Sequence, residues 1–384
     1  MNYLFGLKKY SDFLLFFISI ILFSFAPWLS LQSSITSFVL KVLYLIFFLS
    51  LLISFSVAKF SRKKISKTIP IIFFVIVYLL LGIFYAGISA VLSTFVNFGI
   101  PLIIVLYFYT VSEMKLSKKM FFILNFEIVL CVLLNCFFSI YLITNFDGNF
   151  DVLYISKADY AEYNYLRNGR LRAFGFLNSA VIFSNYLSIF VIYTISYIKK
   201  KKYFVMRSIL LVIMIICLYL SGSRTPFFSV FVSFFLLFLC KKRANLIPLL
   251  STLAIGFILL FLTLAEGLDL SSLGRIKQYM EAFNLFFQRP FGWGWGYAGF
   301  PKGVVSFDCT ILVLLVNFGI LGGFILYKLF NRFLLQNVYL NFFGCILIVN
   351  LFLLSGFVNC THLGILTLII ELNYLMKISH KKCV

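Results

Sequence analysis

Arginines outside the apolar runs are the residues best suited to chemistry in this chain. A guanidinium group is planar and permanently charged, and its fork of N–H donors matches the oxygens of a phosphate or diphosphate. The candidates lie in two long polar segments and one short turn. They are Arg170, Arg172, Arg224, Arg275 and Arg289. We expect these arginines to bind an anionic diphosphate group.

Arg224 lies in the short turn Ser221-Gly222-Ser223-Arg224-Thr225-Pro226. Thr225 and Pro226 form a plain helix start, with an N-cap followed by proline at the first helical position. That pattern explains the turn but not the arginine, and we favour a binding role for Arg224. For any single arginine taken alone, pairing with nearby acids or with lipid phosphates is the simpler explanation.

Two further ionisable residues stand at the entries to apolar runs. Asp308, in the segment Ser306-Phe307-Asp308, suits a general base or a group that orients an acceptor hydroxyl. Capping of the following helix explains Asp308 as well, and both readings stay open. His362 begins the last apolar run, where a lone histidine is more often a cap or a packing residue. The only other histidine, His380, is in the C-terminal tail, so we expect no histidine metal cluster.

The elements that position these residues are apolar helices. The chain of 384 residues is 62% hydrophobic and 20% aromatic, far above the apolar share of a soluble domain. We expect twelve apolar runs of about 15–25 residues, the length that crosses a hydrocarbon core of about 30 Å as helix. Continuous runs exclude the alternating pattern of a barrel. The fold class is therefore an all-α polytopic integral membrane protein, treated as a single membrane domain over residues 1–384.

The distribution of charge gives the orientation of the chain. Seven short breaks hold 23 of the 33 Lys and Arg residues, and they fall on one side of the predicted membrane. By the positive-inside rule, both termini are cytoplasmic. The formal net charge of +21 therefore reflects topology, and we expect no nucleic-acid partner. Two long loops, residues 144–178 and 265–304, then face outward. The helices that follow Arg172 and Arg224 begin at this outer face, where their positive dipole ends favour an anion.

The second long loop has structure of its own. Apolar residues recur at helical spacing over residues 272–287, which predicts an amphipathic helix lying on the outer leaflet. The segment after it alternates glycine with other residues and cannot continue as regular helix. Its residues of interest are Gly292, Trp293, Gly294 and Trp295. Both tryptophans suit the headgroup layer.

Three segments carry a resemblance to a known family. They are Arg172-Ala173-Phe174-Gly175-Phe176-Leu177-Asn178, Leu220-Ser221-Gly222-Ser223-Arg224-Thr225, and Gln288-Arg289-Pro290-Phe291-Gly292-Trp293-Gly294 followed by Ser306-Phe307-Asp308 and Asn317-Phe318-Gly319-Ile320-Leu321-Gly322. In this order they resemble the motifs of the Wzy-type polymerases of O-antigen and capsule repeat units, which are related to O-antigen ligases. The helix count and the two long loops agree with that family over the whole chain.

The resemblance implies a metal-independent glycosyltransferase, of GT-C-like architecture and without a cofactor, at the outer face of the bacterial cytoplasmic membrane. A growing glycan on undecaprenyl diphosphate would pass to the non-reducing end of a new lipid-linked unit. Arg172, Arg224 and Arg289 would hold the diphosphate, and Asp308 would orient or deprotonate the acceptor hydroxyl. Membrane lipids and a chain-length-regulating co-polymerase are the implied partners.

The family's histidine near Ser306–Asp308 is missing here, which leaves Asp308 or His362 as the base and favours the polymerase over the ligase. The alternative from another class is a flippase for lipid-linked oligosaccharides. Twelve helices with both termini inside fit such a transporter, but the positions of the long loops break a six-plus-six repeat.

Overall fold

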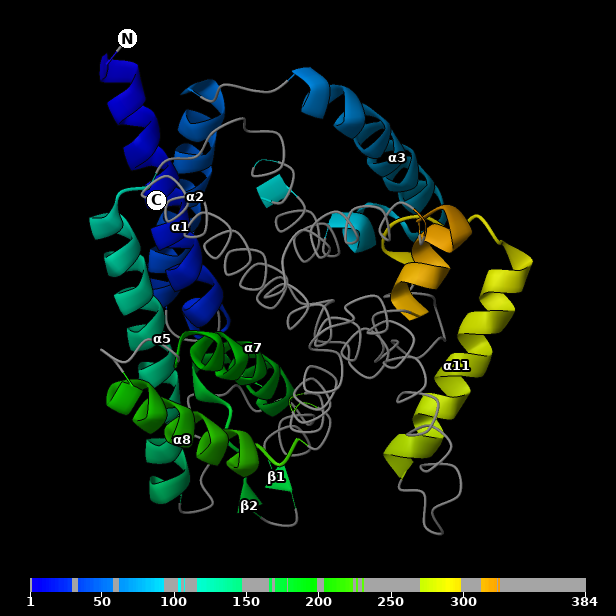
Figure 1. Cartoon of the computed structure of the whole chain (residues 1–384). Coiled ribbons are helices and arrows are strands. Elements are labelled where there is room, and N and C mark those ends of the chain that lie inside the picture. The colour runs from blue at the N-terminus through cyan, green and yellow to red at the C-terminus, as the bar shows by residue number, and fades with distance from the viewer. Residues whose placement is uncertain are drawn as a thin grey trace, which may run out of the picture. The chain divides into compact units, whose positions relative to one another are not determined.

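The described part of the chain is almost entirely helical in a computed structural model (Figure 1). The structure describes residues 2–29, 34–57, 62–92, 116–146, 166–167, 170–177, 179–198, 204–223, 270–297 and 312–322, with the single residues 103, 104, 107, 226, 230 and 324. Its helices are α1 (Asn2–Leu29), α2 (Ser34–Val57), α3 (Arg62–Ala86), α5 (Lys118–Asn145), α7 (Ala180–Ile198), α8 (Phe204–Leu220) and α11 (Leu270–Gln288). A further helical segment runs over Leu312–Gly322.

Three of these helices are long and apolar enough to cross a membrane. The segments are Lys8–Ala26 in α1, Phe38–Ser56 in α2 and Lys119–Asn145 in α5. Shorter apolar helices lie at Ile72–Ala86, Ala180–Val191, Val205–Leu220 and Leu312–Gly322. The chain is thus a mostly helical membrane protein, as its composition predicts. The count of twelve spans and the cytoplasmic placement of the termini stay predictions.

Basic segments predicted as breaks extend the helices at their starts. The sequence predicts the first and third helices from about residues 12 and 69, whereas α1 begins at Asn2 and α3 at Arg62. Lysine and arginine are good helix formers, so charge alone does not end a helix. A true start signal is present at α5, where the Ser117 hydroxyl accepts a hydrogen bond from the Met120 amide at 3.3 Å.

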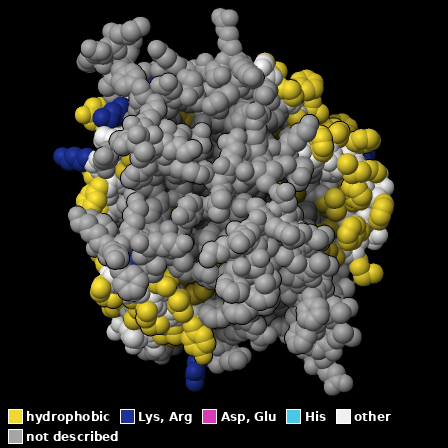
Figure 2. Space-filling view, in the orientation of Figure 1, with side chains coloured by type: hydrophobic (Ala, Val, Ile, Leu, Met, Phe, Trp, Pro, Cys, Tyr) yellow, Lys and Arg dark blue, Asp and Glu magenta, His cyan; other side chains and the backbone are white. Residues whose placement is uncertain are grey.

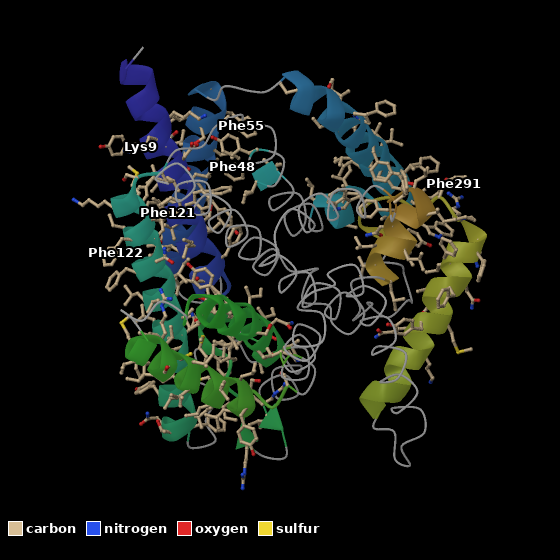
Figure 3. The ribbon with its side chains drawn as sticks, in the orientation of Figure 1. Lys9, Phe48, Phe55, Phe121, Phe122 and Phe291 are labelled. Atoms are coloured by element: carbon tan, nitrogen blue, oxygen red, sulfur yellow. The ribbon has the colours of Figure 1, made fainter. Side chains whose placement is uncertain are left out.

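One compact unit contains α1, α2, α5, α7 and α8. Helix α1 packs against both α2 and α5, and α7 packs against α8 (Figure 1). Buried polar groups join the helices as well. The Ser24 hydroxyl of α1 lies 3.1 Å from the Tyr186 hydroxyl of α7, and the Tyr193 hydroxyl donates to the Asn125 side chain of α5. Adjacent residues of α5 face different surroundings, since Phe121 is buried and Phe122 is 62% exposed (Figure 3).

The other compact unit contains most of α3, α11 and the helix at Leu312–Gly322. One of its clusters joins Ala282 of α11 to Leu312, Val313 and Val316. A second joins Tyr78 of α3 to Trp295 and Phe318. Side chains on the outward faces of the described helices are largely hydrophobic, in yellow in Figure 2, as expected for contact with lipid. The expectation of a single domain over residues 1–384 stays a prediction.

Candidate functional site

Arg172 is directed at the turn that precedes Arg224. Its Nε donates a hydrogen bond to the Ser221 carbonyl at 2.8 Å, and its Nη2 donates to the Ser223 hydroxyl at 2.8 Å. The amide of the next residue, Ala173, donates to the Leu220 carbonyl at 3.1 Å. Two segments about 50 residues apart in the sequence, both singled out by the resemblance, are therefore joined directly by the fork of one guanidinium group.

The serines of this turn complete a closed set of hydrogen bonds. Ser223 accepts from Arg172 and donates its hydroxyl proton to the Ala180 carbonyl at the start of α7, at 3.4 Å. The Ser221 hydroxyl donates to the Leu218 carbonyl at 2.7 Å and accepts from the Ser223 amide at 3.3 Å. Gly222, between them, has a φ of 60°, a conformation that glycine adopts without strain. Both serines are buried, so these bonds fix the turn.

Gly175 explains the spacing of the motif that begins at Arg172. Its amide donates to the Ser139 hydroxyl of α5 at 2.6 Å, and the Phe176 amide donates to Asn135 Oδ1 at 3.0 Å. With a φ of 56°, Gly175 lies so close to α5 that an added Cβ would come 2.7 Å from Asn135 Oδ1. The Phe176 ring stacks on Phe138 of α5 at 4.0 Å between centroids. The segment is thus held to α5 on one side and to the α8 turn on the other.

In the other unit, the loop after α11 is held by main-chain atoms. The Trp293 amide donates to the Val316 carbonyl at 2.9 Å, and the Gly294 amide donates to the Asn317 carbonyl at 3.0 Å. In the reverse direction, the Ile320 amide donates to the Pro290 carbonyl at 3.0 Å. The two segments of the third motif therefore lie side by side, as their joint appearance in the sequence suggests.

Helix α3 closes the loop from a second direction. The Trp295 amide donates to the Tyr78 carbonyl at 2.8 Å, and the Tyr78 hydroxyl donates to the main-chain carbonyls of Phe291 and Phe318. Glycines permit this approach. A Cβ on Gly294 would come 2.2 Å from the Gly82 amide nitrogen, and one on Gly82 would come 2.0 Å from the Trp295 carbonyl oxygen. Only glycine allows two backbones to pass this closely.

The guanidinium group of Arg289 lies over aromatic rings. Its Cζ lies 4.1 Å from the centroid of the Tyr85 ring and 4.5 Å from that of Trp293. Trp293 in turn stacks on Tyr297 at 4.5 Å with 11° between planes. We call Tyr85, Trp293 and Tyr297 the aromatic box. Within the described part of the chain, no carboxylate pairs with Arg289. A guanidinium stacked on rings keeps its N–H donors in the plane at its edge, a geometry suited to an anion.

The aromatic box is itself anchored. The Trp293 indole N–H donates to the Leu285 carbonyl of α11 at 2.9 Å, which fixes the ring that Arg289 covers. Burial raises the pKa of Tyr297 above its usual range, while the positive charge of Arg289 acts in the opposite direction. Tyr297 is consequently a neutral hydroxyl at physiological pH, and Arg289 is the charged side chain that the described residues place over the box.

The remaining predicted residues divide into three groups. Arg170 lies in strand β2 (Arg170–Leu171), which pairs with β1 (Leu166–Arg167), and it is exposed. Arg275 lies within α11, in a turn whose side chains are not described. The positions outside the described residues are Arg224, Ser306, Asp308 and His362. For these four positions the sequence-based roles stay predictions.

Several positioning residues carry no signal in the motifs. Tyr78, Gly82 and Tyr85 of α3 all contact the 289–297 loop, yet their helix reads as an ordinary apolar span. A lone glycine inside a helical pattern is the single hint, because it marks a place where another backbone approaches closely. Asn135 and Ser139 of α5 are buried polar residues one helical turn apart, a spacing that indicates a shared partner.

Comparison with protein families gives a match over part of the chain. Residues 209–327 match the family model described as O-antigen ligase. The match covers most of α8, the Ser221–Ser223 turn, α11, the loop after it and the helix at Leu312–Gly322. No curated protein and no solved structure matches the chain. The match supports a relationship to enzymes that act on lipid-linked glycans in polysaccharide biosynthesis, and it does not separate polymerase from ligase.

Proposed function

We propose that this protein polymerises lipid-diphosphate-linked oligosaccharide repeat units at the outer face of the bacterial cytoplasmic membrane. The observation that carries the proposal is the bridge from Arg172 to Ser221 and Ser223. It joins two of the family-like motifs and fixes the turn immediately before Arg224. Preorganised electrostatic catalysis requires polar groups that are fixed before the reaction, and the hydrogen bonds of Ser221 and Ser223 fix their turn in this way.

The reaction is a glycosyl transfer without nucleotide. The bond between the anomeric carbon of the growing glycan and its lipid diphosphate breaks, and a bond from that carbon to an acceptor hydroxyl forms. The electron pair leaves with the diphosphate, whose charge Arg224 stabilises. Asp308 takes the proton of the acceptor hydroxyl, with His362 as the alternative base. Arg289, Arg170 and Arg275 are assigned to the diphosphate as well.

Arg172 has a different role in this scheme from the one that its sequence suggests. Two of its donors are directed at Ser221 and Ser223, so it acts through the turn and is a positioning residue. Ser223→Ala separates the two roles, because it leaves the arginine charge in place. If Arg172 acts through the turn, Ser223→Ala lowers turnover in the same direction as Arg172→Lys. If Arg172 instead touches the substrate, Ser223→Ala leaves turnover unchanged.

The decisive experiment reconstitutes the purified protein with its lipid-linked repeat unit and separates the products on a gel. A ladder of repeat-unit multiples on lipid diphosphate, formed without nucleotide and in the presence of a chelator, is the expected result. Arg224→Ala should abolish the ladder at normal abundance of the protein. Lys41→Ala, which removes one exposed positive charge from α2, is the matched control and should preserve it. Unchanged single units that cross the bilayer would identify a flippase instead.

A ligase is the second candidate, because the description of the matching family model favours it. A ligase transfers the glycan to a different acceptor lipid and makes no ladder from repeat units alone. Adding a lipid A–core acceptor to the same reconstitution distinguishes the two enzymes. Product on that acceptor, with no multiples in its absence, would favour the ligase and contradict the polymerase.

A further inference from the structure

Helix α11 has the length of a membrane span but not the composition of one. It runs 19 residues from Leu270 to Gln288, yet it is absent from the described helices that are apolar enough to span. A helix of this length that remains at the surface of a membrane protein must satisfy two media at once. Its side chains show how.

The described side chains of α11 fall into three sectors around the helix axis. One sector packs on the protein and contains Gln278, Ala282 and Leu285, with Arg289 next in register. A second sector is exposed and apolar. It contains Met280, Phe283 and Phe287, and Phe291 in the turn after the helix is also exposed (Figure 3). With three to four residues per turn, these positions form one continuous stripe, which we call the apolar stripe.

The third sector is polar and adjoins the apolar stripe. It contains Lys277, Glu281, Asn284 and Gln288, of which Glu281 is half-buried and the other three are exposed. The large side chains of the apolar stripe are highly exposed, with Phe287 at 73% and Met280 at 64%. An exposed apolar sector beside an exposed polar sector is stable only where hydrocarbon meets water. Contact with protein alone accounts for neither sector, and bulk water accounts only for the polar sector.

The charges next to the stripe indicate which molecules it contacts. Lys277 is exposed on the polar sector, and Arg289 is held in the aromatic box one residue beyond the end of α11. Lipid phosphates lie at the boundary between hydrocarbon and water, and tryptophan and tyrosine are enriched at this depth. Arg289 shares that depth, since a helix lying along the boundary inserts its apolar face about 5–10 Å and keeps its axis level.

We propose that α11 lies along the membrane–water boundary with the apolar stripe in the acyl chains, and that it thereby sets Arg289 at the depth where it binds the phosphate of a membrane lipid headgroup. The occupant is a phosphate-bearing lipid rather than a soluble anion. This site rests on the proposed function only in that a lipid diphosphate is one such lipid. The placement of α11 stands independently of any glycan transfer.

The placement is tested with single added cysteines at three positions, in proteoliposomes, with a membrane-impermeant maleimide. The unaltered chain supplies the background from its native cysteines. Asn284→Cys, on the polar sector, should react at least about tenfold faster than Phe287→Cys, on the apolar stripe. Ala282→Cys, on the buried sector, is the control for an intact fold and should not react. Equal reaction at positions 284 and 287 would overturn the placement.

A second measurement tests whether lipid or another protein surface covers the apolar stripe. A bimane label on Phe287→Cys, attached in detergent before reconstitution, should be quenched by lipids brominated in their acyl chains. No quenching would mean that another protein surface covers the apolar stripe, and it would overturn the proposal. Neither measurement involves glycan or activity, so a chain that makes no polymer still decides this question.

The phosphate site is tested by thermal unfolding of the purified protein in neutral detergent. Short-chain phosphatidic acid should raise the midpoint of the unaltered chain and leave that of Arg289→Gln unchanged. Inorganic phosphate at the same concentration should not shift either midpoint. An equal shift with inorganic phosphate would contradict a lipid source, and no shift with either probe would overturn the site. Lys41→Gln, which removes an exposed charge of α2, is the matched control and should still respond.

Discussion

Arg172 and Arg289 come from similar motifs, yet the molecule holds them by opposite means. Arg172 donates two hydrogen bonds to its own chain, at Ser221 and Ser223, and so organises a turn. Arg289 lies over the rings of Tyr85 and Trp293 and pairs with no described carboxylate. We therefore interpret Arg172 as a clamp on a turn and Arg289 as a preoriented charge, and diphosphate binding by either residue stays a prediction. Residue type alone does not tell the two roles apart.

The surroundings of the two arginines differ in the same way. The Arg172 segment is fixed mainly by side chains, through Ser139, Asn135 and Ser223. The loop after Arg289 is fixed mainly by backbone contacts at glycines. Side-chain contacts can relax when one partner changes, whereas crowded backbones cannot. Six substitutions test this difference, and the largest effect is expected where backbone meets backbone.

Gly294→Ala should have the largest effect. The new Cβ would come 2.2 Å from the Gly82 amide nitrogen. Neither backbone can move away without displacing the loop. We expect a large loss of monodisperse protein in size-exclusion chromatography. Gly87→Ala is the matched control, because Gly87 has a similarly positive φ of 88° but nothing within 4 Å of an added Cβ. It should show only backbone strain, about 1 kcal/mol. A stable Gly294→Ala variant would contradict the close contact.

Gly175→Ala extends the comparison to the other unit. Its nearest neighbour is the Asn135 side-chain oxygen, which can rotate away, so it should lose less protein than Gly294→Ala under the same conditions.

Replacing each of the two arginines with lysine should have the next largest effect on stability. Arg172→Lys cannot reproduce the two-point contact and leaves a buried serine group without its donor, which costs about 1–3 kcal/mol. Arg289→Lys keeps a cation near the rings and should cost about 1 kcal/mol or less. Unfolding midpoints of the purified variants measure the difference. A larger loss for Arg289→Lys would reverse our assignment of clamp and charge.

Tyr78→Phe should have a smaller effect that is confined to the loop after α11. It removes the donor to the carbonyls of Phe291 and Phe318, at a cost of about 1 kcal/mol. Tyr219→Phe is the control, since Tyr219 is 76% exposed. Limited proteolysis within residues 289–297 provides the measurement. Identical cleavage rates for the two variants would show that the Tyr78 hydroxyl does not secure the loop.

Ser223→Ala should be the mildest change, because the bond from Arg172 Nε to the Ser221 carbonyl persists. The informative experiment combines Ser223→Ala with Arg172→Lys in a double-mutant cycle. We expect the pair to be non-additive by at least about 0.5 kcal/mol, the sign of a shared contact. Strict additivity of the unfolding free energies would mean that the two side chains do not interact.

The apolar parts of the described helices followed from the sequence because long apolar runs predict helices, whereas the basic breaks did not mark the starts of α1 and α3. The predicted helix at 272–287 matches α11 at Leu270–Gln288 for the same reason, since its apolar residues recur at helical spacing. The contacts of the arginines did not follow, because they depend on which carbonyl or ring lies opposite in space. Arg172 reads as a diphosphate ligand from its motif, and only the structure shows that its guanidinium donates to the Ser221 carbonyl. Its role toward a diphosphate stays a prediction.

The hairpin at Leu166–Leu171 shows a signal that was present but not used. Its strands pair Arg167 with Arg170 and Leu166 with Leu171. The two residues between them, Asn168 and Gly169, are the pair most typical of a two-residue hairpin connection. The segment is short and polar, so its hydrophobic pattern gives no sign of structure. The roles of Tyr78 and Tyr85, in contrast, have no local signal, since only tertiary packing gives them their partners.

The loop between Arg289 and Tyr297 is secured largely by amides, carbonyls and glycines, which all share one consequence. Its path does not depend on what several of its side chains are. Phe291, for example, is 67% exposed while its carbonyl is held by Tyr78. Such a loop can keep its backbone path while its exposed side chains change. Divergence of specificity among related chains, and its deliberate engineering, should therefore concentrate at positions such as Phe291 and avoid the glycines beside it.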